Sequence, residues 1–342
     1  MTPQLTITQA GPALSLQDQG RSGYRAQGLT IGGAADRTAL FEGAALLGQP
    51  ASHAAIEMAG SGGIFTSDTD ISIALTGADM AANIDGEPLG WGASHRLPAG
   101  AKLTIGGTRN GSYGYLHVGG GFATPQVMGS QSAHLAGGIG TLLQSGDVLP
   151  LGPDKSDSVA MTLPKSDRYG GGKIRLVASM QTASFDAETI ERFSATTFRR
   201  DARANRMGVR MDFDGAGFAT GAQLSIVSEV VVPGDIQISG DGAPYVLMYE
   251  CQTTGGYPRI GSVLPCDLPR VAQAQTGAAL RFEFVGMEEA VNLQAHYIAT
   301  LKSLPSQVTP LVRDPSHIRD LLSYQMISGA VSAAANPFEQ ES

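Results

Sequence analysis

Charged residues are scarce in this sequence of 342 residues, since they make up 16% of it where about a quarter is typical of soluble domains. The few charges are also unbalanced, because 23 Lys and Arg stand against 31 Asp and Glu, for a net charge of −8. Nucleic-acid binding depends on concentrated Lys and Arg. The composition therefore argues against DNA or RNA as the main partner.

Cysteine is almost absent, with only Cys251 and Cys266 in the chain. Neither belongs to a Cys-x-x-Cys pair or a Cys/His cluster, so no structural metal site is expected. Two isolated thiols are typical of a reducing compartment, and we expect both to be reduced and partly buried. A disulfide between them is the alternative.

The sequence also lacks an apolar run of about 18 residues, which a membrane-spanning helix needs. Its opening, MTPQLTITQAGPALSLQDQG, has no basic start followed by an apolar stretch, and so does not resemble a signal peptide. We therefore expect a cytoplasmic protein without a membrane partner.

Glycine, in contrast, is abundant, with 45 residues beside 18 prolines. Without a Gly-X-Y period, so much glycine indicates many tight turns between short strands. Most segments alternate apolar and polar residues, as Ile71, Ile73 and Leu75 illustrate. The pattern predicts a mainly β protein built of barrels or sandwiches.

Only a few helices are expected. Residues 38–47 predict a short helix with Asp36 as its N-cap, and residues 288–304 predict a longer one. Residues 267–273 predict a third helix, with Asp267 in the capping position.

Two linker-like stretches, 151–158 and 167–172, divide the chain into β-rich halves of similar length. We therefore predict an N-terminal domain over residues 1–160, a C-terminal domain over 161–310 and a tail over 311–342.

Residues 251–258, CQTTGGYP, follow the apolar run 245–249 and are too long and too polar for a plain turn. The two glycines allow a ligand to approach the backbone, and the Gln, Thr and Tyr side chains offer uncharged donors and acceptors. Such a set suits a neutral amide or carbonyl ligand, with an elaborate hairpin connection as the alternative. Since the segment contains no general base, Glu57 and Glu250 are the candidates for that role.

Arg21 lies in a turn flanked by glycines, where a guanidinium can bind a carboxylate or phosphate. The alternative is a structural arginine that pairs with Asp18 or Asp36. Ser130 and Ser132 lie in a polar loop that lacks the surroundings of a nucleophilic serine. We expect that loop to be solvated or to contact a partner.

A series of short motifs, taken in order along the chain, resembles the allophanate hydrolase subunit 2 family. This family is also described as KipA-like or as the C subunit of bacterial ATP-dependent 5-oxoprolinase, and it is related to the carboxyltransferase domain of urea carboxylase. Each motif is weak alone, and their ordered combination is specific. They lie at residues 15–24, 33–36, 56–57, 119–122, 129–132, 137–140, 145–147, 205–208, 234–237, 241–244 and 251–258.

The chain also departs from the family pattern. The family usually has Gly-Ser-Arg-Ser-Thr where this chain has Gln131 and Ala133 within residues 129–133. An Asp is common where Glu250 and Cys251 stand.

The resemblance implies a fold of two cyclophilin-like β-barrel domains. It also implies ATP-driven hydrolysis of 5-oxoproline to glutamate by a complex that includes a KipI-like B subunit and a lactam-handling A subunit. ATP would be bound somewhere in that complex. In this interpretation Arg21 and Arg206 bind a carboxylate or phosphate group of the ligand, and Gln and Thr side chains bind its amide. The residues expected to line one pocket are Arg21, Asn205, Arg206, Gln237, Gln252, Thr253, Thr254, Gly255 and Tyr257.

Two alternatives share the same family. One is a biotin-dependent carboxyltransferase that acts on urea or a related amide; because the chain has no Met-Lys-Met biotin acceptor, biotin would arrive on another chain. The other is a non-enzymatic regulator that sequesters a KipI-like protein.

Overall fold

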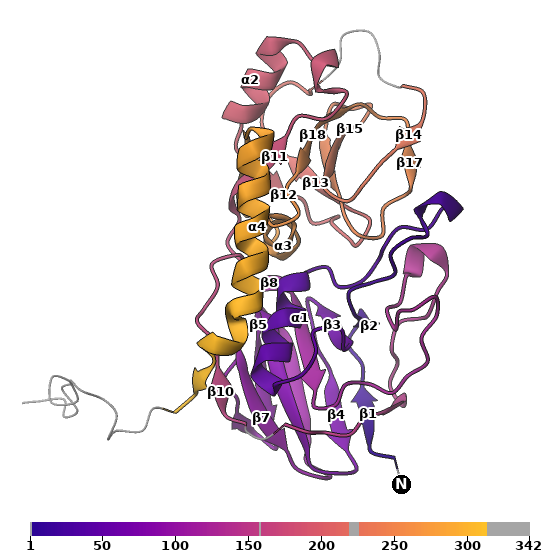
Figure 1. The fold of residues 1–342 in the computed structure, drawn as a ribbon, viewed down its shortest axis with the longest axis vertical. Helices are drawn as coiled ribbons and strands as arrows, with labels where there is room; N and C mark the ends of the chain where they lie inside the picture. The colour runs from indigo at the N-terminus through magenta and orange to yellow at the C-terminus, as the bar shows by residue number, and fades with distance from the viewer. Residues whose placement is uncertain (1, 157–158, 219–225, 313–342) are drawn as a thin grey trace, which may run out of the picture.

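The computed structural model describes residues 2–156, 159–218 and 226–312. The protein is mainly β, as predicted. Two β-rich bodies follow each other along the long axis of the molecule, and one long helix runs beside both (Figure 1). The tail predicted from residue 311 onward lies almost wholly outside the described residues.

The first body is an 11-stranded sheet in which all pairs are antiparallel. Two long strands, β5 and β8, pair along most of their length and bury their apolar side chains, because alternating residues point to one face. The strands are β1 (Gln4–Gln9), β2 (Leu14–Gln17), β3 (Ala55–Ala59), β4 (Ile64–Ser67), β5 (Ile71–Ile84), β6 (Glu87–Pro88), β7 (Ala93–Leu97), β8 (Leu103–Val118), β9 (Val148–Pro150), β10 (Met161–Thr162) and β20 (Thr309–Pro310).

The second body is a closed barrel in the order β11-β18-β15-β16-β13-β12-β19. Its interior is packed by aromatic rings, with Phe193, Phe198 and Phe282 within 5.2 Å of one another by ring centroids. The barrel strands are β11 (Gly172–Val177), β12 (Phe198–Arg200), β13 (Gly208–Asp212), β15 (Asp235–Ile238), β16 (Pro244–Leu247), β18 (Arg259–Val263) and β19 (Ala279–Phe284), and a separate pair is formed by β14 (Glu229–Val230) and β17 (Thr254–Gly255).

Helices are few, as expected. The predicted N-cap of the first helix is confirmed, because the Asp36 side chain accepts a hydrogen bond from the N–H of Ala39 at 3.4 Å. The helices are α1 (Arg37–Leu47), α2 (Ala187–Ala195), α3 (Leu268–Gln273) and α4 (Met287–Ser303), with 3-10 turns η1 (Arg25–Gln27), η2 (Leu135–Gly137), η3 (Thr182–Ser184) and η4 (Leu304–Gln307).

One helix was missed, and the N-cap prediction for α3 was right in position but not in its hydrogen bond. Helix α2 was not predicted, although Asp186 caps it by accepting from the N–H of Thr189 at 2.6 Å. Asp267 precedes α3 but makes no side-chain cap. Its carboxylate instead accepts from Arg175, at 2.5 and 2.8 Å.

Both thiols are free, which confirms that expectation, and Cys251 is buried while Cys266 is half-buried. Burial raises the pKa of Cys251 to about 12 and that of Cys266 to about 11. Among the described helices, none is both long and apolar enough to span a membrane.

Candidate functional site between the two bodies

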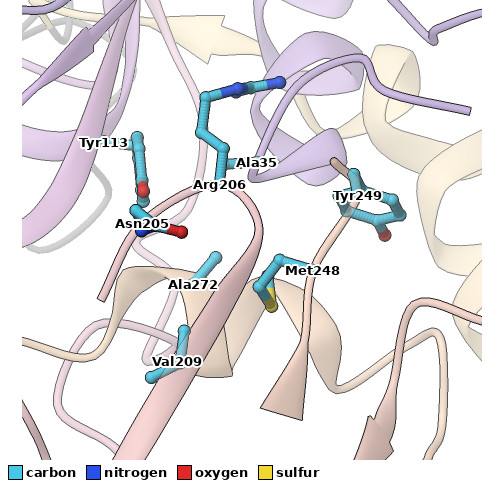
Figure 2. A pocket seen from close by; sticks show the side chains of 8 residues that line it. All are labelled: Ala35, Tyr113, Asn205, Arg206, Val209, Met248, Tyr249 and Ala272. Atoms are coloured by element: carbon cyan, nitrogen blue, oxygen red, sulfur yellow. The ribbon is translucent and has the colours of Figure 1, made fainter. Parts of the chain in front are cut away.

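Arg206 occupies the turn that leads into β13, at the junction of the two bodies. Asn205 fixes this turn, because its Oδ1 accepts from the N–H groups of Met207 at 2.8 Å and Gly208 at 3.2 Å. Held in this way, the Arg206 side chain extends from the second body toward the first (Figure 2).

The Arg206 guanidinium is bound by both bodies. Its Nε donates to Glu250 at 2.5 Å, and its Nη1 donates to Glu57 of β3. Its Nη2 donates to the Gln17 side chain at 3.2 Å and to the Gly33 carbonyl at 2.5 Å. Glu57 and Glu250 are each only 2% exposed. Burial disfavours the charged guanidinium, but the two carboxylates outweigh this effect and raise the pKa of Arg206.

Glu57 is held as firmly as the arginine. Its Oε2 accepts from the N–H of Ala35 and from the Tyr115 hydroxyl, each at 2.7 Å. The Tyr115 hydroxyl also accepts from the N–H of Asp36 at 2.8 Å. Burial, with the nearby charge of Glu57, raises the pKa of Tyr115 well above its ordinary value. A carboxylate with this many partners is well suited to fixing the position of Arg206.

A small cavity lies beside these groups. Its volume is about 10 Å³, which is enough for about one water molecule. Figure 2 shows Asn205 and Tyr113 among the residues at its wall. The lining residues are Ala35, Tyr113, Asn205, Arg206, Val209, Met248, Tyr249 and Ala272.

Arg21 is 2% exposed. Its Nη2 donates to the carbonyl of Ser132 at 2.5 Å and its Nε to the carbonyl of Val127 at 3.3 Å. Its Nη1 has no hydrogen-bond partner within the described residues. Within the described residues, Arg21 does not pair with Asp18 or Asp36, which was the alternative expectation. It instead binds the loop at residues 127–132 through main-chain carbonyls, and one of its donors stays unused.

The loop with Ser130 and Ser132 is exposed over residues 125–129 and 135–138, as expected, but the two serines themselves are buried. Both serines are at most 2% exposed, and both hydroxyls donate to Asp18 Oδ1, at 2.6 and 2.5 Å. Asp18 also accepts from the N–H groups of Gly20 and Gln131, each at 2.7 Å. The sequence did not indicate this burial, because the carboxylate that binds the two serines lies more than 110 residues away along the chain.

Gln131, where the resemblance leads us to expect an arginine, has a local role. Its amide donates to the carbonyls of Phe122 at 2.7 Å and Thr124 at 3.0 Å. These hydrogen bonds close the loop from residue 122 to residue 131, and they use the amide donors of Gln131 within the chain.

The segment CQTTGGYP directly follows Glu250, the partner of Arg206, and pairs through β17 with β14. Gln237 of β15 accepts from the Gln252 amide at 3.3 Å, while the Nε2 of Gln237 is buried without a partner in the described structure. A Cβ on Gly255 would lie 2.4 Å from this Nε2, so glycine lets the Gln237 amide approach the backbone closely. Thr254 and Tyr257 are exposed.

His134 connects the two regions, and sequence reasoning gave it no role. Its Nδ1 accepts from the N–H of Gly137 at 3.0 Å, so the proton lies on Nε2. That Nε2 donates to the Thr30 hydroxyl at 3.0 Å, which donates to the Cys251 carbonyl at 2.9 Å. The chain of bonds runs from the loop of the first body to the start of CQTTGGYP.

The predicted site residues thus form two neighbouring groups. Arg21, Asn205 and Arg206 lie around the junction, where Glu250 acts electrostatically on Arg21 and binds Arg206. Gln237, Gln252 and Gly255 form the second group, with Thr253, Thr254 and Tyr257 on the same segment. Within the part of the chain that the structure describes, no three His, Cys, Asp or Glu side chains gather as a metal site requires.

Comparison with known proteins identifies the family. Residues 27–284 match the model of the carboxyltransferase domain, subdomain A and B. The chain belongs to this carboxyltransferase domain family.

Its curated relatives include the 5-oxoprolinase C subunit of Escherichia coli, 34% identical over 84% of this chain and 93% of that protein. The same-named protein of Haemophilus influenzae is 33% identical over 82% of this chain and 91% of that protein. The crystal structure of Kluyveromyces lactis urea amidolyase superposes with a TM-score of 0.78 at 20% identity, covering 92% of this chain and 21% of that one. At this identity, the urea amidolyase shows the fold alone.

Proposed function

We propose that this chain is one subunit of a complex that uses ATP to hydrolyse 5-oxoproline to glutamate, and that it has little activity alone. The observation that carries the proposal is the 34% identity to the 5-oxoprolinase C subunit across 93% of that protein. Because the likeness extends over nearly the whole relative, it includes both bodies and the junction between them. We place the complex in the cytoplasm, in keeping with two free thiols.

The two unused donors of the site match the two functional groups of 5-oxoproline. That molecule carries a neutral lactam and a carboxylate. Gln237 Nε2 is buried without a partner in the described structure, and with Gln252 it would hydrogen-bond the lactam. Arg21 Nη1 is likewise buried and unused there, and would bind the carboxylate. A donor left unpaired in a buried place is costly unless a ligand completes it.

Arg206 is assigned a positioning role. Since Glu57 and Glu250 already neutralise its charge, it would hold the two bodies, and with them the two donors, in register. Thr253, Thr254, Gly255 and Tyr257 would form the wall of the ligand site, and Asn205 would fix the Arg206 turn.

ATP is a co-substrate in this proposal. It is bound within the complex that this chain forms with a KipI-like B subunit and a lactam-handling A subunit. Its hydrolysis supplies free energy, and water adds across the lactam C–N bond to give glutamate. Residues of this chain bind and orient the lactam in that step.

The test is 5-oxoproline-dependent phosphate release by this chain purified with its A- and B-like subunits, with each protein omitted in turn. We expect turnover only when all three are present. Turnover by the A and B subunits alone at the full rate would refute a role for this chain.

Arg206 gives a sharper test within the complex. We expect Arg206→Ala to lower turnover at least tenfold, because a change in the relative position of two binding groups is costly to catalysis. Arg199→Ala is the matched control, since Arg199 lies nearby in sequence on β12, is exposed and pairs with exposed Asp214. Equal turnover by the two variants would show that the junction is not part of the site.

A carboxyltransferase acting on urea or a related amide is the second candidate, and the family description favours it. Urea amidolyase of Saccharomyces cerevisiae is 24% identical over 93% of this chain, but the match spans only 19% of that protein. Biotin would then be supplied by another chain. A three-subunit complex with no 5-oxoproline turnover, but with carboxyl transfer from added carboxybiotin to urea, would favour this candidate. A stable complex without either reaction would favour a KipI-binding regulator.

A further inference from the structure

Arg200 ends strand β12 at the side of the barrel that faces the first body. Because side chains alternate along a strand, Arg200 points to the same face as Phe198, which is fully buried in the barrel core. Its backbone is fixed, since its N–H donates to the Ala278 carbonyl at 3.2 Å and its carbonyl accepts from Gly277 at 2.8 Å. The residue is 8% exposed.

This buried guanidinium is uncompensated in the described structure. Its Nε is inaccessible and has no hydrogen-bond partner there. The carboxylate that acts on it, that of Asp201, instead binds Arg203 at 2.6 Å and Arg210 at 3.1 Å. Burial lowers the pKa of Arg200, and the nearby Asp201 carboxylate does not offset this effect. An unpaired buried charge is unfavourable and calls for a counter-charge.

Two other arginines with little exposed side chain differ from Arg200 in their partners. Arg168 lies between Asp36 and Glu42, and Arg206 lies between Glu57 and Glu250. Each therefore has two carboxylates.

A solvent-open cavity of about 450 Å³ adjoins Arg200. Gly60, Thr108 and Ser112 line it from the first body, and Gln275 and Thr276 line it from the second. No Asp or Glu is among its lining residues in the part of the chain described. A Cβ on Gly60 would meet no atom within 4 Å, so the wall is open there. The volume suits a small metabolite.

We infer that this cavity is a binding site for a small anion with a carboxylate or phosphate group, which Arg200 binds as its counter-charge. A guanidinium offers parallel N–H donors that match both groups. The hydroxyl and amide side chains around it provide neutral hydrogen bonds without repelling the anion. Since both bodies line the cavity, the ligand would bridge them. The site is distinct from the donors on which the proposed function rests.

Binding of inorganic phosphate and of acetate to the full chain tests this inference, by calorimetric titration in buffers of matched chloride concentration. We expect the wild type to bind at least one probe, which identifies the preferred group. We expect Arg200→Met to weaken that binding at least tenfold and Arg200→Lys to weaken it less. Arg199→Met is the control, because it removes an exposed arginine one residue away, and it should bind as the wild type does.

Thermal unfolding of the same variants separates binding from folding. Without phosphate or acetate, Arg200→Met should unfold at the wild-type temperature or above it, because it removes an unpaired buried charge. The probe should then raise the unfolding temperature of the wild type but not of Arg200→Met. The inference is overturned if the wild type binds neither probe, if Arg200→Met binds as tightly, or if Arg200→Met unfolds well below the wild type in anion-free buffer.

Discussion

At the scale of the residue, burial has different consequences according to the partners that accompany it. The Arg206 side chain is 13% exposed and binds two carboxylates, and its pKa is raised, whereas Arg200 is buried without a carboxylate partner and its pKa is lowered. His117 is a third case. It is 3% exposed, and Thr76 is its hydrogen-bond partner at 2.8 Å. Burial lowers its pKa to about 3.

His117 should therefore make the stability depend on pH. Below about 6.5 the unfolded chain takes up a proton on this imidazole, while the folded chain stays neutral down to about 3. Its contribution to the free energy of unfolding is thus lost as the pH falls, by about 1.4 kcal/mol per unit. Between pH 7 and pH 5 we expect urea denaturation to show about 2 kcal/mol more loss in the wild type than in His117→Gln.

His296→Gln is the control, because His296 is exposed on α4, and it should follow the wild type. The assignment to His117 fails if wild type and His117→Gln lose the same stability over this range.

The resemblance predicted Arg206 as a residue that binds an anion, whereas in the structure it pairs with two carboxylates of the chain itself. The resemblance singled out the motif at 205–208, but Arg206 binds Glu57 across 149 residues and Glu250 across 44. No local pattern encodes such pairs. Arg200 did leave a signal, since a strand that buries Phe198 also buries the residue two positions on. A buried arginine at such a position can be suspected from the sequence, but its lack of a counter-charge cannot.

At the scale of the element, α1 shows how closely a helix can pack on a sheet. It begins at the Asp36 cap and ends at Gly48, whose φ of 62° is left-handed. Its Gly43 lies against the His117 ring of β8, and a Cβ there would lie 2.4 Å from three ring carbons.

Gly43→Ala should therefore destabilise the protein by about 1–3 kcal/mol, the cost of overpacking, although Gly→Ala in an open helix position is stabilising by about 1 kcal/mol. In a His117→Ala background the ring is gone, and the same substitution should be neutral or favourable. Urea denaturation of the four proteins measures the coupling. An equal loss in both backgrounds would show that the ring is not the obstacle.

Elements with a strong local signal were predicted well. The prediction for α1 over 38–47 differs from the structure by one residue at its start, and the prediction for α4 over 288–304 is shifted by one residue at both ends. Helix α2 was missed, although Asp186 caps it and Ile190 and Phe193 are spaced for one face. Its nine residues are too short for a clear helical period.

At the scale of the whole molecule, the two bodies are joined by buried polar groups. Gln273 of α3 is fully buried. Its Oε1 accepts from the N–H groups of Ser112 and Tyr113, each at 3.0 Å. Its Nε2 donates to the Tyr113 carbonyl and to Asp36, each at 2.8 Å. One side chain thus connects the second body to β8 and to the cap of α1.

We expect Gln273→Leu to cost about 2–4 kcal/mol, because it leaves several buried polar groups unpaired. Scanning calorimetry should also show less cooperative unfolding, since the link between the bodies is weakened. Gln275→Leu is the control, because Gln275 makes one side-chain bond, to Arg109 at 3.2 Å. The same unfolding profile for both variants would argue that Gln273 does not couple the bodies.

Helix α4 runs beside both bodies and returns the chain to the first sheet (Figure 1). There β20 pairs with β10 in register, Thr162 opposite Thr309. The chain leaves the first sheet and re-enters it at adjacent strands, so the barrel is topologically an insertion. The barrel could therefore be gained, lost or exchanged as one unit during evolution, and the hydrogen-bonded strands of the first sheet would stay paired.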